Sequence, residues 1–174
     1  SAGLGHPGRT ISRDNEPMDL SKFEFVLRVN LVGTFNMLSR AAGAMAFTDP
    51  LDDDGQRGSI VNMASVAAFD GQIGQAAYSA SKGGIVGMTL PIARDLAVAG
   101  IRVNTIAPGL IDTPIYGEGE QSDAFKAHLG QSVLFPMRLG SAEELAYMVM
   151  ELITNPYMNG EVIRVDGGIR MPPK

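Results

Sequence analysis

Residues 59–65, SIVNMAS, form a short and mostly apolar segment in which polar and apolar residues do not alternate cleanly. This pattern is typical of a parallel β-strand that is covered on both faces. The segments IRVNTIA at 101–107 and EVIRVD at 161–166 are interpreted as a second and a third strand. A helical pattern precedes each strand. Right-handed crossovers between such units give a parallel sheet with helices on both faces.

The predicted helices alternate with these strands. They lie at residues 21–45, with a break near Gly33, at 76–98, and from 141 to about 152. Ser21–Glu24 and Ser141–Glu144 have the capping-box pattern that begins a helix, and Gly100 is expected to end the second helix. Residues 110–140 are expected to be a long connection with some helical content.

The predicted fold class is α/β: a Rossmann-like, doubly wound parallel sheet in a three-layer arrangement, with a single domain over residues 1–174. Strand 59–65 would have a bare apolar edge if nothing paired beside it, and such an edge promotes aggregation. We therefore expect the first strands of the sheet to lie N-terminal to residue 1.

The composition narrows the range of functions. The 174 residues include no cysteine, which excludes disulfides, a thiol nucleophile and a cysteine metal site. The net charge of −5 argues against nucleic acid or an anionic membrane as a partner. No apolar run reaches the roughly 18 residues of a membrane span, and no secretory or transit signal is visible, so a cytoplasmic location is expected. His6 and His128 have no second ligand at metal spacing, so no metal site is predicted.

The segment QAAYSASKGG at 75–84 places a tyrosine and a lysine one helical turn apart among small residues. Residues four apart share one face of a helix, so Tyr78 and Lys82 can reach the same site, where the ammonium would favour a phenolate. Ser65 ends a buried parallel strand 13 residues earlier, and functional groups in such sheets gather at the carboxyl ends. Taken alone, the pair also fits a tyrosine packed against a surface lysine. Together with Ser65 it predicts an acid/base centre.

Four motifs in this order make the chain resemble the short-chain dehydrogenase/reductase family. They are NLVGTFNM at 30–37, VNMAS at 61–65, YSASK at 78–82 and GIRVNTIAPG at 100–109. Residues 74–97, the RLG at 138–140 and NGEVIRVDGGIRM at 159–171 resemble the short-chain 3-hydroxyacyl-CoA dehydrogenases within it. The resemblance implies hydride transfer between a secondary alcohol or ketone and a nicotinamide cofactor, NAD or else NADP. It also implies a small-molecule substrate, such as an acyl-CoA, and a homotetramer.

The family pattern implies a role for each matching residue. Tyr78 would exchange a proton with the substrate oxygen, and Ser65 would hydrogen-bond the same oxygen. Lys82 would stabilise the deprotonated tyrosine and bind the nicotinamide ribose. Asn30 would sit in a helix break and hold water in a proton relay through Lys82, although a residue that only kinks the helix would fit the same position.

Further matches concern the cofactor and the substrate. The resemblance places Ala2, Gly3, Pro108, Gly109 and Thr113 beside the cofactor, gives Ile111 a backbone contact to its carboxamide, and makes Gln72 a candidate substrate contact. Ser1 replaces the asparagine of the family's motif at this point. Phe125, Leu129, Val133 and Leu134 are expected to form either the apolar side of a lid or a surface helix.

The family's glycine-rich phosphate-binding turn has no counterpart in these residues. Gly3–Gly8 matches G-x-G-x-x-G, but no strand precedes it and no helix follows it before Ser21, so a loop is predicted. The chain is therefore expected to be the C-terminal two-thirds of such an enzyme, and a protein of this length is expected to bind little or no NAD(H). The alternatives are a 3-oxoacyl-carrier-protein or ketosteroid reductase of the same family, and a non-catalytic scaffold that has lost the cofactor half.

Overall fold

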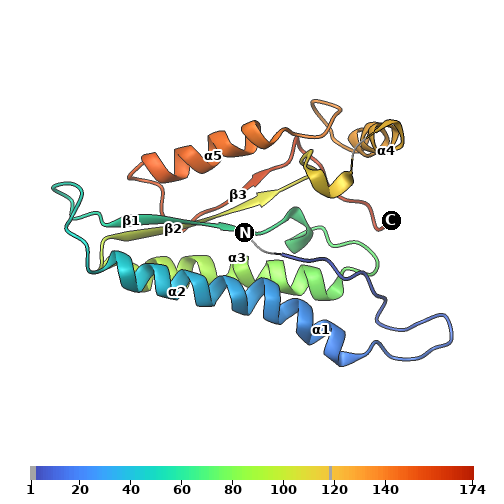
Figure 1. The fold of residues 1–174 in the computed structure, drawn as a ribbon, viewed down its shortest axis with the longest axis horizontal. Coiled ribbons are helices and arrows are strands. Elements are labelled where there is room, and N and C mark those ends of the chain that lie inside the picture. Colours follow the sequence, from blue (N-terminus) through green and yellow to red (C-terminus); the bar gives the residue numbers. More distant parts are fainter. Residues whose placement is uncertain (1–2, 118) are drawn as a thin grey trace.

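Three parallel strands form the central layer of the molecule, a computed structural model that describes residues 3–117 and 119–174 (Figure 1). The strands are β1 (Gly58–Met63), β2 (Ile101–Pro108) and β3 (Val162–Val165), and they lie in the order β1-β2-β3. In the first pair Gly58 is opposite Ile101, and in the second Thr105 is opposite Val162. The parallel α/β sheet predicted from the sequence is confirmed.

Burial explains why β2 takes the centre. All of its residues from Ile101 to Ala107 are buried, including the polar Asn104 and Thr105. These polar side chains are satisfied, since Asn104 Nδ2 donates to the carbonyl of Met158 at 2.8 Å and Thr105 shares a 2.6 Å hydroxyl contact with Thr89. A strand that is apolar on both faces and has paired polar groups is stable only between two layers.

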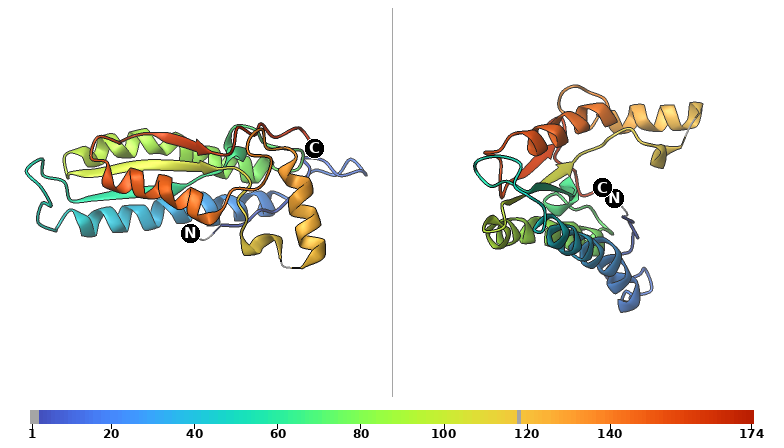
Figure 2. Two further views of the ribbon diagram at one scale, coloured as in Figure 1. Left: turned by 90° about the horizontal axis from the view of Figure 1, so that it is seen from above. Right: turned by 60° about the vertical axis from the view of Figure 1, so that its left-hand side comes forward.

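Helices cover both faces of this sheet, as Figures 1 and 2 show. On one face lie α1 (Leu20–Leu27), α2 (Gly33–Met45) and α3 (Ala76–Ala97), and on the other lies α5 (Ala142–Thr154), with α4 (Glu120–Gly130) beyond the strand ends. Leu38 of α2 and Ile92 of α3 pack on Val103 of β2 in one core cluster. The predicted three-layer arrangement is thus confirmed.

The first long helix begins at a different residue from the one predicted, whereas its break lies near Gly33, as predicted. Asp19, and not Ser21, is its N-cap, because the Asp19 carboxylate accepts a hydrogen bond from the backbone N–H of Ser21 at 2.9 Å. The break is a π-helical turn over Arg28–Val32, which ends before Gly33. The capping box at Ser141 is confirmed, with Glu144 bonding back to the Ser141 N–H.

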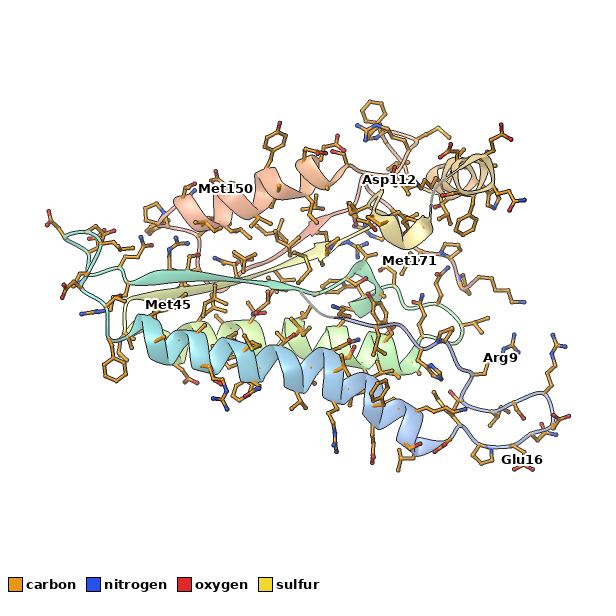
Figure 3. All side chains as sticks on the ribbon, viewed as in Figure 1. Arg9, Glu16, Met45, Asp112, Met150 and Met171 are labelled. Atoms are coloured by element: carbon orange, nitrogen blue, oxygen red, sulfur yellow. The ribbon has the colours of Figure 1, made fainter. Side chains whose placement is uncertain are left out.

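Strand β1 lies at one edge of the sheet. Gly58 begins β1 against Met45 at the end of α2, which lies beside the start of the strand (Figure 3). Within residues 3–117 and 119–174, no strand pairs with the other edge of β1. The prediction of further strands there stays a prediction. No helix among the described residues has the length and apolar character needed to cross a membrane.

Candidate active site

The carboxyl end of β1 leads directly into Ser65. This residue has extended backbone and caps the 3₁₀ turn Val66–Ala68, where its Oγ accepts a hydrogen bond from the N–H of Ala67 at 3.2 Å. A serine hydroxyl that accepts this bond can still donate its own hydrogen. Ser65 therefore provides a hydrogen-bond donor at the strand end, where a substrate oxygen could accept it.

Lys82 brings helix α3 to the same strand end. Its side chain is buried, and Nζ donates a 2.9 Å hydrogen bond to the carbonyl of Met63, the last residue of β1. Burial lowers the pKa of Lys82, since desolvation disfavours the ammonium. Nζ also lies 5.8 Å from the centre of the Tyr78 ring. The predicted sharing of one helical face by Tyr78 and Lys82 is thus present, and this face meets the strand that carries Ser65.

Asn30 lies in the π-helical turn and is buried. Its amide oxygen accepts from the N–H of Leu4 at 2.9 Å, while its Nδ2 donates to the Leu4 carbonyl at 2.9 Å and to Ser81 Oγ at 3.0 Å. Asn30 therefore does occupy a helix break, and it also fixes the chain at residue 4. Both hydrogens of its amide are used in these contacts, so its place in a water relay stays a prediction.

Ser81 is a site residue that sequence reasoning missed. It is completely buried, accepts from Asn30 and donates a 2.7 Å hydrogen bond to the carbonyl of Tyr78. It thereby joins the break in the first helix to the turn of α3 that carries the tyrosine. A serine inside a helix commonly bonds back to a carbonyl of the preceding turn, which is the signal that could have identified it.

The turn after β2 approaches the end of β3 closely. The N–H of Gly109 donates to the Val165 carbonyl at 2.9 Å, and a Cβ at Gly109 would lie 2.7 Å from the Cβ of Asp166. Only glycine fits here without displacing β3. Pro108 is the last residue of β2, so the pair predicted to face the cofactor lies at the carboxyl end of the sheet.

Ile111 and Thr113 continue this turn. Ile111 forms an isolated parallel bridge with Gly140, made by the Leu110 carbonyl and the Asp112 N–H. In such a bridge the intervening residue directs its own N–H and C=O away from the partner. The N–H and C=O of Ile111 therefore point away from Gly140, and the contact of this backbone to a carboxamide stays a prediction. Thr113 precedes the 3₁₀ turn Pro114–Tyr116.

Helix α4 is attached to this turn through two contacts. Lys126 forms a 2.9 Å ion pair with Asp112, and the rings of Phe125 and Tyr116 lie 6.3 Å apart. The pKa of Tyr116 is raised by burial first, and then by electrostatic interaction with Tyr78 and Asp112. Tyr116, which sequence reasoning also missed, thus lies within electrostatic reach of the candidate acid/base.

The four apolar residues suggested as a lid have different environments. Val133 is buried against Gly167, whereas Phe125 is half exposed and Leu134 is largely exposed. Leu129 is partly buried. Both interpretations, a lid and a surface helix, therefore remain predictions.

Of the three remaining predicted residues, the structure describes Gly3 and Gln72. A Cβ at Gly3 would be 3.9 Å from Lys82 Nζ, so its backbone stands beside the lysine, whereas Ala2 lies outside the described residues. Gln72 donates to the Pro172 carbonyl at 3.1 Å and lines two adjoining hollows of about 560 and 580 Å³. Its contact with substrate stays a prediction. In the described part of the chain, no group of three His, Cys, Asp or Glu side chains could hold a metal ion.

Comparisons with known proteins agree with this arrangement. Residues 1–170 match the family model described as enoyl-(acyl carrier protein) reductase. The chain is 57% identical over 161 residues to 3-hydroxyacyl-CoA dehydrogenase type-2 of Rattus norvegicus, covering 92% of this chain and 60% of the relative. It is 54% identical over 173 residues to the Homo sapiens protein of the same name, covering 99% of this chain and 65% of the relative.

A solved structure is similar over nearly the whole chain. The crystal structure of 3-hydroxyacyl-CoA dehydrogenase type-2 from Mycobacterium avium superimposes with a TM-score of 0.92 at 43% identity, and the match covers 99% of this chain and 65% of that one. The resemblance inferred from the motifs is thus confirmed. The chain spans only 60 to 65% of the length of these relatives.

Proposed function

The chain belongs to the short-chain dehydrogenase/reductase family, and from this premise we propose that it catalyses hydride transfer between NAD and a secondary alcohol or ketone, with a 3-hydroxyacyl-CoA as the first substrate to test. The observation that carries the proposal is the contact between Lys82 Nζ and the Met63 carbonyl. It brings the helical turn of Tyr78 to the end of the strand that continues into Ser65.

The residues at these strand ends fit the nicotinamide end of such a cofactor. Lys82 gives one of its three ammonium hydrogens to Met63, and the others can reach ribose hydroxyls. Ile111 directs its backbone N–H and C=O away from Gly140, which suits a planar carboxamide. Gly109 lacks a side chain at the point where the turn passes close to Asp166. When bound, the cofactor supplies the hydride chemistry.

The chain's own residues hold the substrate and move its proton. Ser65 donates its O–H to the substrate oxygen and fixes the reacting carbon at the carboxyl end of the sheet. The Tyr78 phenolate takes the hydroxyl proton during oxidation and becomes the phenol, which returns the proton during reduction. The Lys82 ammonium, 5.8 Å from the ring centre, favours the phenolate electrostatically. Asn30 and Ser81 hold the turn of Tyr78 in place through the hydrogen bond from Ser81 to the Tyr78 carbonyl.

The alternatives differ in substrate or in the loss of catalysis. The description of the matching family model suits a carrier-protein-linked reductase, and a ketosteroid reductase is the other alternative in the same family. Assays with each substrate distinguish these from a 3-hydroxyacyl-CoA dehydrogenase. A non-catalytic scaffold is the third alternative, and residues 3–8 are loop in the structure. Titration with NADH tests the scaffold directly, because a scaffold without the cofactor half would not bind it.

Assembly into a homotetramer is also proposed. Several apolar side chains are exposed on the helices of one face of the sheet, namely Phe25, Val32, Phe35, Met37 and Leu90. Exposed apolar groups of this size favour a protein interface. They support assembly through the faces of α2 and α3.

Tyr78→Phe in the full-length protein tests the mechanism. Removing the hydroxyl removes the proton acceptor, so we expect turnover of a 3-hydroxyacyl-CoA to fall by about 100-fold or more while NADH binding is retained. Tyr157, which is 97% exposed, provides the control, and Tyr157→Phe should keep full activity. Turnover of Tyr78→Phe near the wild-type rate would refute the proposed role.

A further inference from the structure

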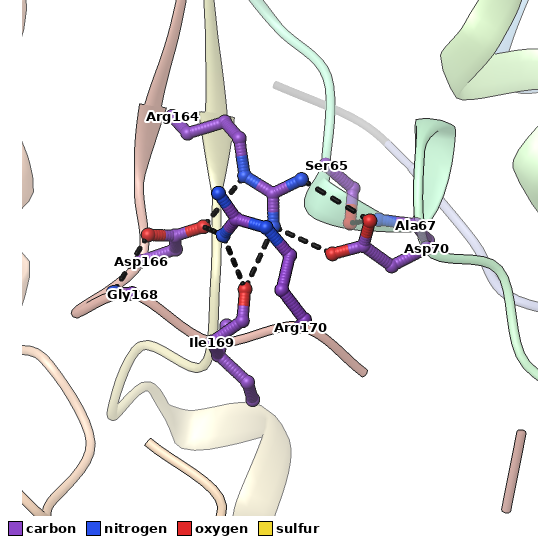
Figure 4. Close-up of polar contacts among 8 residues, drawn as sticks. All are labelled: Ser65, Ala67, Asp70, Arg164, Asp166, Gly168, Ile169 and Arg170. Atoms are coloured by element: carbon purple, nitrogen blue, oxygen red, sulfur yellow. Dashed lines mark hydrogen bonds and ion pairs between the residues drawn. The ribbon is translucent and has the colours of Figure 1, made fainter. Parts of the chain in front are cut away.

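A single guanidinium, that of Arg164 on β3, connects three segments (Figure 4). Its two terminal nitrogens donate to the two carboxylate oxygens of Asp70, at 3.2 and 2.6 Å. Its Nε donates to Asp166 at 2.7 Å, and Nη2 also donates to the Ile169 carbonyl at 2.8 Å. Bidentate pairing of this kind fixes direction as well as distance. The pair with Asp70 therefore holds two parts of the chain 94 residues apart in one orientation.

Asp70 is joined to Ser65 by a short, hydrogen-bonded turn. The Asp70 N–H donates to the Val66 carbonyl at 2.9 Å, and the Ala68 N–H donates to the Ser65 carbonyl at 3.0 Å. The Ser65 hydroxyl accepts from Ala67 in the same turn. These bonds connect the position of Asp70 to that of Ser65 through a single turn.

The C-terminal segment supports the next part of the same loop. Gln72 Nε2 donates to the Pro172 carbonyl at 3.1 Å, and the Ile73 N–H donates to the Pro173 carbonyl at 3.0 Å. Residues 71–75 then lead directly into α3 and Tyr78. Three residues of the connection between the serine and the tyrosine, Asp70, Gln72 and Ile73, are thus bonded to residues 164–173, and of these three only Asp70 carries a charge.

Each member of the Arg164–Asp70 pair stabilises the charged form of the other. The hydrogen bond from Arg164 lowers the pKa of Asp70 against the raising effect of burial, and the same bond raises the pKa of Arg164. Both side chains are largely buried, with 21% of Arg164 and 16% of Asp70 exposed. The pair is therefore ionised and ordered at neutral pH, as a rigid anchor requires.

From these contacts we infer that Arg164 and Asp70 are positioning residues, which set the place of the Ser65 hydroxyl relative to the Tyr78 phenol. The inference rests on the proposed function, since Ser65 and Tyr78 are its reacting groups. Neither member of the pair contacts the substrate in this role. Both act through the turn that carries Ser65.

The test uses the full-length protein, NADH titration to count binding sites, and alcohol oxidation measured per binding site. Asp70→Ala should lower kcat by about tenfold, since small displacements of reacting groups are costly, while KM and the Kd for NADH stay within about twofold. Asp70→Glu keeps the charge pair and should recover most of kcat. The double variant Asp70→Ala with Arg164→Met should be no slower than the slower of the two single variants, because both changes break the same contact, the one between Arg164 and Asp70.

Arg170 offers a matched control. It also donates to Asp166, at 3.3 Å, and to the Ile169 carbonyl, at 2.7 Å, but it has no bond to Asp70 and is mostly exposed. Arg170→Met should therefore retain the wild-type kcat. If Arg164→Met does not fold, the Asp70 variants alone decide the test.

Three results would count against the inference in distinguishable ways. An inactive wild-type protein with intact NADH binding would refute the proposed function, and the inference with it. Wild-type kcat in Asp70→Ala, measured per NADH site, would refute the inference alone, even if that variant melts earlier. Losses that add fully in the double variant would show that the two residues act separately, which also contradicts it.

Discussion

Two largely buried arginines stand at opposite ends of the sheet and differ in their partners. Arg102, at the amino end of β2, donates to backbone carbonyls of Leu152, Ile153 and Met158 at 2.6 to 2.9 Å. Arg164, near the carboxyl end of β3, binds the carboxylates of Asp70 and Asp166. The first faces neutral acceptors and the second faces two negative charges.

The partners explain the two roles. The carbonyls of Leu152 and Ile153 belong to the last turn of α5, where helix carbonyls lack partners and a cation is favourable. Arg102 thus satisfies a helix end, and burial lowers its pKa because no carboxylate binds it directly. Arg164 instead holds the loop behind Ser65. In parallel sheets functional groups gather at the carboxyl ends of strands, so the same residue type supports stability at one end and geometry at the other.

The largest expected effect concerns the amino end. Arg102→Met would leave three carbonyls without their charged donor, so we expect the free energy of unfolding to fall by about 3 kcal/mol. Urea denaturation measures this loss. The comparison requires that kcat per NADH site stay at the wild-type value in the folded fraction. A loss of kcat without a loss of stability in Arg102→Met would contradict the assignment of Arg102 to stability.

A smaller effect is expected at the other end of the same helix. Ser141 Oγ accepts from the Glu144 N–H at 3.2 Å and caps α5 with a neutral, exposed group. Ser141→Ala should lower the free energy of unfolding by about 1 kcal/mol, as measured for such caps. Thermal melting of this variant beside Arg102→Met would show how much more the buried, charged cap contributes. Equal losses would mean that burial of Arg102 adds nothing.

The smallest effect distinguishes the two arginines by pH. The folded pKa of Asp70 is depressed below its ordinary value of 3.8, so its pairing stabilises the fold above that value and is lost as the pH falls below it. The difference in unfolding free energy between wild type and Asp70→Asn should shrink between pH 5 and pH 3, on the order of 1 kcal/mol or less. The matching difference for Arg102→Met should change less over this range, because its hydrogen-bond acceptors do not titrate and only the more distant charge of Asp52 acts on it.

Several features that depend on residues close together in the sequence were predicted correctly. The apolar strands, the capping box at Ser141 and the shared face of Tyr78 and Lys82 each depend on residues a few positions apart. The capping box expected at Ser21 was wrong because Asp19, two residues earlier, captures the Ser21 N–H. That competition is also local, and closer attention to the aspartate could have identified it.

The helix break shows where local reasoning ends. A break was expected near Gly33 and at Asn30, and the π-helical turn Arg28–Val32 contains Asn30 and ends next to Gly33. What the sequence did not indicate is the set of partners of Asn30, which are Leu4, 26 residues away, and Ser81, 51 residues away. No pattern within the helix contains that information, because the amide turns toward groups that only folding brings near.

The sequence by itself determined the α/β class, the family and the pairing of Tyr78 with Lys82, since these depend on periodicity, motif order and helical spacing. Only the tertiary structure decided that Lys82 is tied to Met63, that Asn30 and Ser81 hold the tyrosine turn, and that Arg164 anchors the loop of Ser65. The reason is physical. A hydrogen bond between residues 94 positions apart forms only when strands and helices have packed and excluded water, so its partners leave no trace in local spacing.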